Sequence, residues 1–73
     1  MISNVEEIGG RWFWTHTDDM GETTRMRTNL NYTGCFVKDG KREEWKQIYG
    51  TSQFSLNGKS KSAIRAYLRR MFD

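Results

Sequence analysis

The segment SKSAIRAYLRRMF, residues 60–72, predicts the helix around which this chain is organised. Its apolar residues recur at intervals of three and four positions, so they form one stripe on a helix with about 3.6 residues per turn. The stripe consists of Ile64, Tyr67, Leu68, Met71 and Phe72. Ser60 or Ser62 can cap the first turn by accepting a hydrogen bond from a backbone N–H group. Such a stripe needs an apolar surface to cover, and the upstream segments predict a β-sheet.

Residues 11–17, RWFWTHT, are the strongest strand candidate because aromatic and β-branched side chains dominate them. A second strand is predicted over residues 23–32. Alternation there places Met26, Leu30 and Tyr32 on the tryptophan face and Arg25, Arg27 and Asn29 on the opposite face. A three-residue loop that ends at Gly21, with a positive φ there, pairs Trp14 with Met26. We expect this register because it sets apolar side chains opposite one another.

The segment from residue 33 to residue 49 allows two interpretations. Asp39-Gly40 is typical of a two-residue type I′ turn, which predicts a hairpin that brings residues 42–49 back as a strand. The alternative is a short helix over residues 42–49 that ends at Gly50. We favour the strand.

The favoured hairpin has a definite register. It pairs Lys38 with Lys41 and Gly34 with Trp45, which directs Phe36 and Trp45 toward the core. The predicted core consists of Trp12, Trp14, Met26, Leu30, Phe36, Trp45, Ile64, Tyr67, Leu68 and Met71. Phe54 and Leu56 anchor the connection before the helix, and Tyr49 also faces the core.

These elements predict an α+β fold, an antiparallel meander of three to four strands with one C-terminal amphipathic helix packed on one face. The chain is expected to form a single domain over residues 1–73. It divides into an N-terminal segment (1–10), a sheet (11–49), a connection (50–59) and the helix (60–72). Within the N-terminal segment, Ser3 to Ile8 predicts one helical turn that Asn4 caps and Gly9 ends.

Composition narrows the class of protein. Aromatic residues make up 14% of the 73 residues, which argues against disorder. The single cysteine, Cys35, cannot form an internal disulfide and fits a reducing cytoplasm. No apolar run approaches the roughly 20 residues that span a bilayer, and the N-terminus lacks the features of a signal peptide, so no membrane partner is expected.

Charge is unevenly distributed along the chain. Residues 1–22 carry one arginine against five acidic residues, whereas residues 23–73 carry eleven Lys and Arg against four. This division favours an anionic partner for the basic part. A soluble surface whose charge is unevenly distributed, with no such partner, explains it equally well.

No pattern of residues predicts catalysis. His16 is the only histidine, and the acidic residues near it lack the spacing of a metal site. Cys35 has no nearby base to activate it as a nucleophile. We therefore expect no enzymatic activity, no metal and no cofactor.

Two basic surfaces are candidates for binding. Alternation places arginines beside Phe13 on the sheet face opposite the tryptophans, and a second set follows the flank of the helix. The predicted binding residues are Arg11, Phe13, Arg25, Arg27, Asn29, Lys46, Arg65 and Arg69. Ordinary solvation of a sheet face and of a helix end is the competing explanation.

Several positions around and after the sheet carry a resemblance to known families, namely Gly50, Thr51, Phe54, Ala63, Ala66 and Tyr67. Over roughly residues 34–67 the topology resembles the arm-binding domains of phage integrases and the plant ethylene-response DNA-binding domains. Both families place a three-stranded sheet in the major groove with a helix behind it, so the resemblance implies DNA binding through the sheet. The diagnostic residues of the families are absent, and an insertion precedes the helix, so no site residue is carried over.

The sequence thus predicts a small basic nucleic-acid-binding module, with DNA favoured over RNA. The alternative is a small effector of the phage or mobile-element type that inhibits a host protein through aromatic and arginine anchors. Exposure of a tryptophan divides the two interpretations, because an exposed tryptophan suits a protein hot spot.

Overall fold

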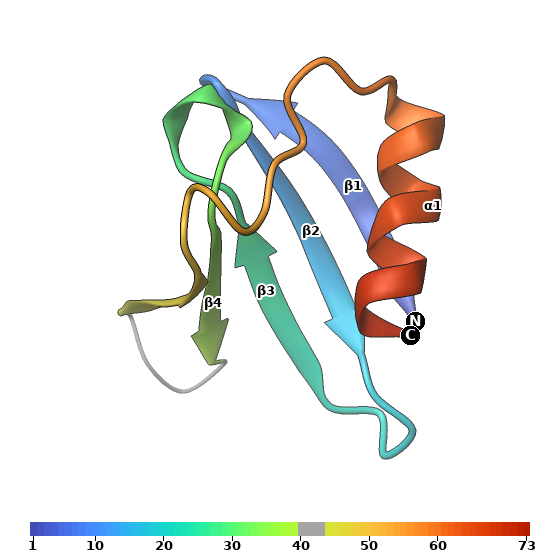
Figure 1. Cartoon of the computed structure of the whole chain (residues 1–73). Coiled ribbons are helices and arrows are strands. Elements are labelled where there is room, and N and C mark those ends of the chain that lie inside the picture. Colours follow the sequence, from blue (N-terminus) through green and yellow to red (C-terminus); the bar gives the residue numbers. More distant parts are fainter. Residues whose placement is uncertain (40–43) are drawn as a thin grey trace.

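A five-stranded antiparallel sheet forms the body of the protein, with one helix packed on one of its faces (Figure 1). The computed structural model describes residues 1–39 and 44–73. The elements are β1 (Ile2–Ile8), β2 (Arg11–Thr17), β3 (Thr23–Arg27), a 3₁₀ turn (Leu30–Tyr32), β4 (Cys35–Asp39), β5 (Trp45–Tyr49) and α1 (Lys61–Phe72). The strands lie in sequence order from β1 to β5. The expected α+β meander with a C-terminal helix is therefore confirmed, but the sheet has five strands, not three to four.

The C-terminal helix forms where its apolar stripe predicts it. The hydroxyl of Ser60 accepts a hydrogen bond from the backbone N–H of Ala63 at 3.3 Å and caps the first turn. Ile64 and Leu68 are fully buried against the sheet. Met71, expected in the core, is exposed because it lies at the edge of the buried stripe.

The β2–β3 hairpin has the predicted register. Trp14 pairs with Met26, and Asp18 closes the loop by donating its N–H to the carbonyl of Glu22 at 3.0 Å. Gly21 has a φ of +81°, the conformation that this loop requires and that glycine adopts without strain.

The N-terminal residues form a strand, so the predicted helical turn over Ser3 to Ile8 is wrong. β1 pairs with β2, and its register shifts between Ser3 and Glu6, where the β-bulge includes Asn4 with a φ of +54°. The bulge turns both Ile2 and Val5 toward the core although they are three residues apart. This spacing resembles helical periodicity in the sequence, and it explains the error.

The strand predicted over residues 23–32 is shorter than expected. β3 ends at Arg27, and the chain then turns through residues 30–32, where Asn31 and Tyr32 both have positive φ. As a result Leu30, expected in the core, is exposed on the turn. Tyr32 packs on Trp12 with ring centroids 6.5 Å apart.

Residues 45–49 form a strand, which supports the favoured interpretation over the short helix, but the hairpin register differs from the predicted one. Lys38 pairs with Trp45, not with Lys41, and Cys35 pairs with Tyr49. The predicted turn at Asp39-Gly40 extends into residues 40–43, which lie outside the described residues. Trp45 lies on the face opposite the core because the β3–β4 pairing places Lys38 beside Arg25 on that face, and Trp45 pairs with Lys38. Phe36, next to Cys35 in β4, lies on that face too.

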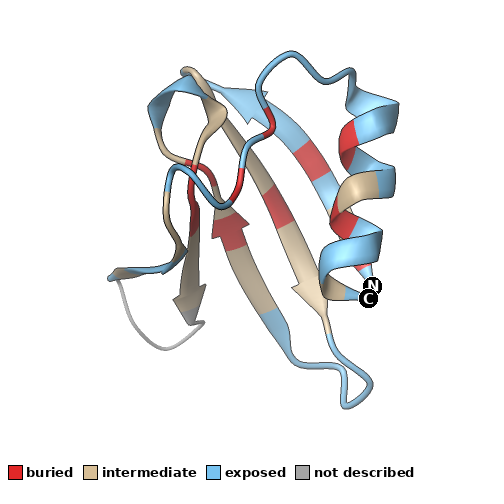
Figure 2. Ribbon diagram, viewed as in Figure 1, coloured by how far each residue is buried: buried red, intermediate tan, exposed pale blue. Residues whose placement is uncertain are grey.

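The core lies between the sheet and the segment that runs from residue 54 through α1 (Figure 2). It consists of Ile2, Val5, Trp14, Met26, Cys35, Phe54, Leu56, Ile64 and Leu68. Phe54 is its centre, with its ring centroid 6.0 Å from that of Trp14 and 5.5 Å from that of Tyr67. Phe54 and Leu56 are thus confirmed as anchors. Trp12 and Tyr67 are half-buried at the rim of this cluster.

The two ends of the chain lie side by side (Figure 1). The amino group of Met1 lies 2.8 Å from the carboxylate of Asp73. The described residues include no helix that is both long enough and apolar enough to cross a membrane.

Candidate functional site

The sheet face that α1 does not cover is the candidate site, and we call it the open face. Alternation along each strand decides which side chains it carries. Its charged and aromatic members are Glu6, Arg11, Phe13, Arg25, Arg27, Phe36, Lys38 and Trp45. Four cationic side chains thus face one carboxylate among the described residues, and three aromatic rings lie between them.

Arg25 lies in the middle of the open face and already has a counter-charge. Its Nη2 donates to Oε1 of Glu6 at 2.8 Å, and its Nη1 donates to Oγ1 of Thr15 at 3.1 Å. Its Cζ lies 5.5 Å from the centroid of the Phe13 ring. The β1–β2 pairing supplies the carboxylate, because Glu6 lies opposite Phe13.

Arg27 is held between two aromatic rings. Its Cζ lies 4.7 Å from the ring centroid of Phe36 and 4.7 Å from that of Trp45, and its Nη1 donates to the carbonyl of Thr28 at 3.1 Å. Burial, and then the positive charge of Arg11, lower the pKa of Arg27. Within residues 1–39 and 44–73, Arg27 forms no ion pair.

Arg11 begins β2 and is half-buried on the open face. Its Nε is buried and has no hydrogen-bond partner in the described part of the chain. Because Phe13 pairs with Arg27 and Arg11 lies two residues before Phe13, Arg11 and Arg27 are diagonal neighbours on one face. Such neighbours are roughly 7–8 Å apart at the backbone, within reach of long side chains.

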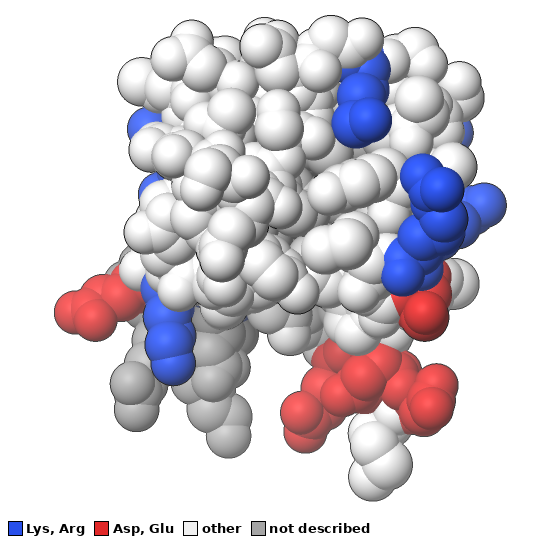
Figure 3. All heavy atoms as spheres, viewed as in Figure 1, with Lys and Arg blue, Asp and Glu red and all other residues white. Residues whose placement is uncertain are grey.

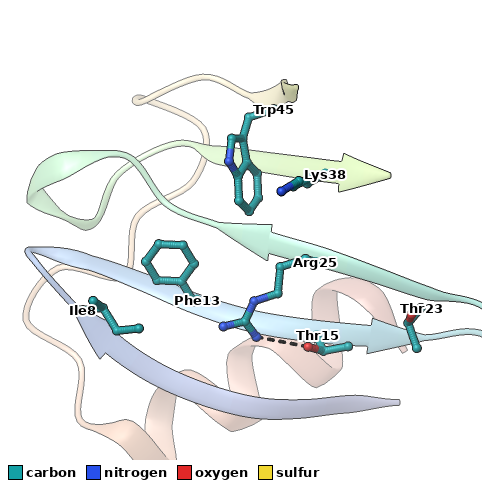
Figure 4. Close-up of a pocket in the computed structure, with 7 residues that line it drawn as sticks. All are labelled: Ile8, Phe13, Thr15, Thr23, Arg25, Lys38 and Trp45. Carbon is teal, nitrogen blue, oxygen red and sulfur yellow. Dashed lines mark hydrogen bonds between the residues drawn. The ribbon is translucent and has the colours of Figure 1, made fainter. Parts of the chain in front are cut away.

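A hollow of about 540 Å³ lies beside the aromatic rings of the open face (Figure 4). Figure 4 shows Trp45 from β5 and Phe13 from β2 pointing toward each other across the strands between them. Their ring centroids are 6.2 Å apart and their planes meet at 69°. We call this pair the aromatic wall. Arg25 and Lys38 also line the hollow, so it combines flat apolar surface with cations.

The structure divides the predicted binding residues between several places. Arg11, Phe13, Arg25 and Arg27 come together on the open face. Asn29 lies beyond the end of β3, where its N–H donates to the carbonyl of Thr33 at 2.9 Å. Lys46 pairs with Val37, which packs against the core, so Lys46 belongs to the other face at the edge of the sheet.

Arg65 and Arg69 form a separate basic surface on α1. Both are exposed, and no described residue forms an ion pair with either of them. Figure 3 shows cations at several places on one face of the molecule and a large group of carboxylates at the lower right. The β2–β3 loop, which carries Asp18, Asp19 and Glu22, lies at that end of the molecule in Figure 1. The helix lies on the opposite side of the sheet from the open face, so the two basic surfaces cannot contact one short ligand together.

Phe36, Lys38 and Trp45 belong to the site but were not predicted there. Phe36 and Trp45 were assigned to the core because the sequence analysis did not identify the turn at residues 30–32, after which β4 pairs Phe36 with Arg27. Asn31, a residue type that tolerates a positive φ, is the sequence signal for that turn.

The histidine, the cysteine and the acidic residues of the described chain do not form a catalytic or metal site. Nε2 of His16 lies 3.1 Å from the carbonyl oxygen of Phe72. Burial raises the pKa of the Cys35 thiol to about 12, so the thiolate does not form near neutral pH. The described residues contain no group of three or more His, Cys, Asp or Glu side chains that could hold a metal ion.

Comparison with protein families, with curated proteins and with solved structures finds no significant match to this chain. The open face is therefore the feature from which a function can be inferred.

Proposed function

We propose that this protein binds nucleic acid on its open face, and that its preferred ligand is single-stranded DNA. The observation that carries the proposal is the interleaving of three aromatic rings with cationic side chains on the side of the sheet that no helix covers. Single-strand binding requires both parts, because rings stack on bases and cations attract the backbone.

The aromatic wall supplies the stacking surface. Phe13 and Trp45 are each half-buried, so each keeps part of its ring accessible while its neighbours hold it in place. Stacking of a base on such a ring contributes about 1–3 kcal/mol and depends little on the identity of the base. The proposal therefore predicts modest sequence preference and strong salt dependence.

The test measures binding of labelled oligonucleotides to variants that lose a ring but keep an apolar side chain. Phe13→Leu and Trp45→Leu are each expected to weaken single-strand binding by about 1–3 kcal/mol, because leucine cannot stack on a base. The control is the double variant Arg65→Ala/Arg69→Ala, which is expected to bind nearly as the unmodified protein does. Equal urea midpoints show that the variants are folded.

Trp45 also offers a direct signal. It is the only tryptophan on the open face, since Trp12 and Trp14 belong to the face that packs on the core. Quenching of its emission by an oligonucleotide, and loss of that quenching in Trp45→Leu, supports stacking there. The proposal fails if neither DNA nor RNA binds at low salt, or if only the helix variant loses binding.

The protein-binding effector is the second candidate, and the half-exposed Trp45 beside Arg27 is the observation that favours it. Tryptophan and arginine are the residues most enriched at protein hot spots. A protein from a nuclease-treated host lysate that the unmodified chain retains and Trp45→Ala does not retain favours this alternative, provided that the chain binds no oligonucleotide.

A further inference from the structure

The three arginines of the open face differ in what neutralises them. Arg25 has the carboxylate of Glu6 at 2.8 Å and the hydroxyl of Thr15 at 3.1 Å. Arg11 and Arg27 have no ion pair with any residue in ranges 1–39 and 44–73. Of the three, Arg11 and Arg27 thus keep the capacity to bind an external anion.

Arg11 presents a donor that the described fold does not use. Its Nε is buried and lacks an acceptor among the described residues. A buried donor without an acceptor is costly, and more so on a charged group. An external acceptor reaches this atom once the side chain shifts outward, and it then gains the hydrogen bond without displacing an internal one.

Arg27 adds a second charge that is held in place. The rings of Phe36 and Trp45 both lie 4.7 Å from its Cζ, so little side-chain freedom remains to be lost on binding. Its position diagonal to Arg11 brings two like charges together on one face. An anion between them replaces repulsion between the two cations with attraction.

We infer that Arg11 and Arg27 together form a seat for one phosphate group of the bound strand, which we call the phosphate seat. This inference rests on the proposed function and assigns its phosphate contact. Planar guanidinium groups match the oxygens of a phosphate, and two of them can hold one group from two sides. Trp45 contacts both Arg27 and Phe13, so a base on the aromatic wall has its backbone near the seat. Arg25 positions Phe13 and does not bind phosphate.

The first test uses inorganic phosphate, so it does not depend on oligonucleotide binding. The Nε–Hε signals of the arginines are followed by NMR while phosphate replaces chloride at constant ionic strength. The signals of Arg11 and Arg27 are expected to move together along one saturation curve, while the signal of Arg25 stays in place. The inference is overturned if neither signal moves, or if Arg25 moves as far as they do.

The second test counts phosphates through the salt dependence of oligonucleotide affinity. Loss of one phosphate contact on a single strand lowers the slope of log affinity against log salt by about 0.7. Arg11→Gln, Arg27→Gln and the double variant are each expected to lower it by no more than this amount, since both arginines hold the same phosphate. Arg65→Gln, on the exposed flank of α1, is the control that makes the same change of charge, and it leaves the slope unchanged. A double variant that loses about twice as much shows two separate contacts and contradicts the shared seat.

Two sources can supply the phosphate group, a backbone phosphodiester or a terminal phosphate. Equal affinity for oligonucleotides with a 5′-phosphate and with a 5′-hydroxyl assigns the backbone. Higher affinity for the 5′-phosphorylated strand that Arg11→Gln abolishes assigns the terminus, and the seat stands in both cases. If no oligonucleotide binds, the proposed function fails, and the titration with inorganic phosphate alone decides whether the seat exists.

Discussion

Thr28 shows how a single side chain completes the sheet where a strand ends. It is a fully buried polar residue, and its Oγ1 accepts a hydrogen bond from the backbone N–H of Trp12 at 3.0 Å. Its own N–H donates to the carbonyl of Trp12 at 2.9 Å. The hydroxyl thus continues the β2–β3 ladder one step beyond Arg27.

Thr28→Val is expected to lower the free energy of unfolding by about 1–3 kcal/mol, because it keeps the shape but leaves the N–H of Trp12 without its acceptor. Urea denaturation measures the loss. Thr24→Val is the control on the same strand and face, since the described residues offer its hydroxyl no hydrogen bond, and it is expected to change stability by less than about 0.5 kcal/mol. Equal effects of the two substitutions contradict the role assigned to the hydroxyl.

Cys35 is a second case in which burial decides chemistry. Its side chain is completely buried, and burial raises the pKa of its thiol to about 12. We expect a thiol-specific reagent to leave the native protein unmodified at pH 8 and to label one thiol after denaturation. Rapid labelling of the native protein indicates that Cys35 is accessible and contradicts this core assignment.

At the scale of elements, a side-chain hydrogen bond ties the 3₁₀ turn after β3 to β1. The hydroxyl of Tyr32 donates to Oε2 of Glu7 at 3.0 Å, and the same oxygen accepts the N–H of Gly10 at 3.2 Å. The hydrogen bond to Glu7, then burial, then the charge of Glu7 raise the pKa of Tyr32. Glu7 thus connects the β1–β2 turn to the turn at residues 30–32.

This tie predicts a pH dependence. Because the pKa of Tyr32 is higher in the folded state than in the unfolded state, its contribution is complete below about pH 10 and is lost as pH rises through the folded value. Tyr32→Phe keeps the ring on Trp12 but removes the tie. The difference between the urea midpoints of the two proteins is expected to be constant at neutral pH and to shrink in alkali. A difference that stays constant in alkali contradicts the role assigned to this hydrogen bond.

The elements differ in how much of them the sequence determines locally. The β2–β3 hairpin was predictable down to its residue pairs, because a Gly at the loop and a regular alternation both specify the same register. β1 was not, because the bulge at Asn4 breaks the alternation and gives Ile2 and Val5 a helix-like spacing. Only the long-range pairing with β2 decides between the two structures.

The same limit applies to the site. Arg11, Phe13, Arg25 and Arg27 were placed together correctly because two strands with a predictable register carry them. Phe36 and Trp45 were assigned to the wrong face because the pairing of β4 with β3 depends on the turn at residues 30–32, which the alternation through residue 32 does not reveal. Half of the aromatic wall was therefore hidden from sequence analysis.

At the scale of the whole molecule, the fold separates its charges. The helix and the open face carry cations on opposite sides of the sheet, and the β2–β3 loop carries Asp18, Asp19 and Glu22. Glu6 departs from this separation, because β1 places it among the cations of the open face. Its ion pair with Arg25 is largely exposed to solvent, so we expect it to contribute no more than about 1 kcal/mol to stability.

If the open face binds nucleic acid, Glu6 weakens that binding through its charge and through its hold on Arg25. Glu6→Gln is expected to tighten single-strand binding, and to steepen the salt slope by up to about 0.7 if the released Arg25 reaches a phosphate. Glu22→Gln makes the same change of charge on the β2–β3 loop. It is expected to leave affinity unchanged, because salt screens charges more than about 10 Å apart.

Titration of a labelled oligonucleotide at several salt concentrations separates the possible outcomes. Tighter binding by both variants means that overall charge matters and that the position of Glu6 does not. Weaker binding by Glu6→Gln alone means that the ion pair with Arg25 holds Phe13 in its binding position. The benefit of that position then exceeds the repulsion between Glu6 and the nucleic acid. Tighter binding by Glu6→Gln alone is the result that the open face requires, because among these carboxylates only Glu6 shares that face with the aromatic wall and the phosphate seat.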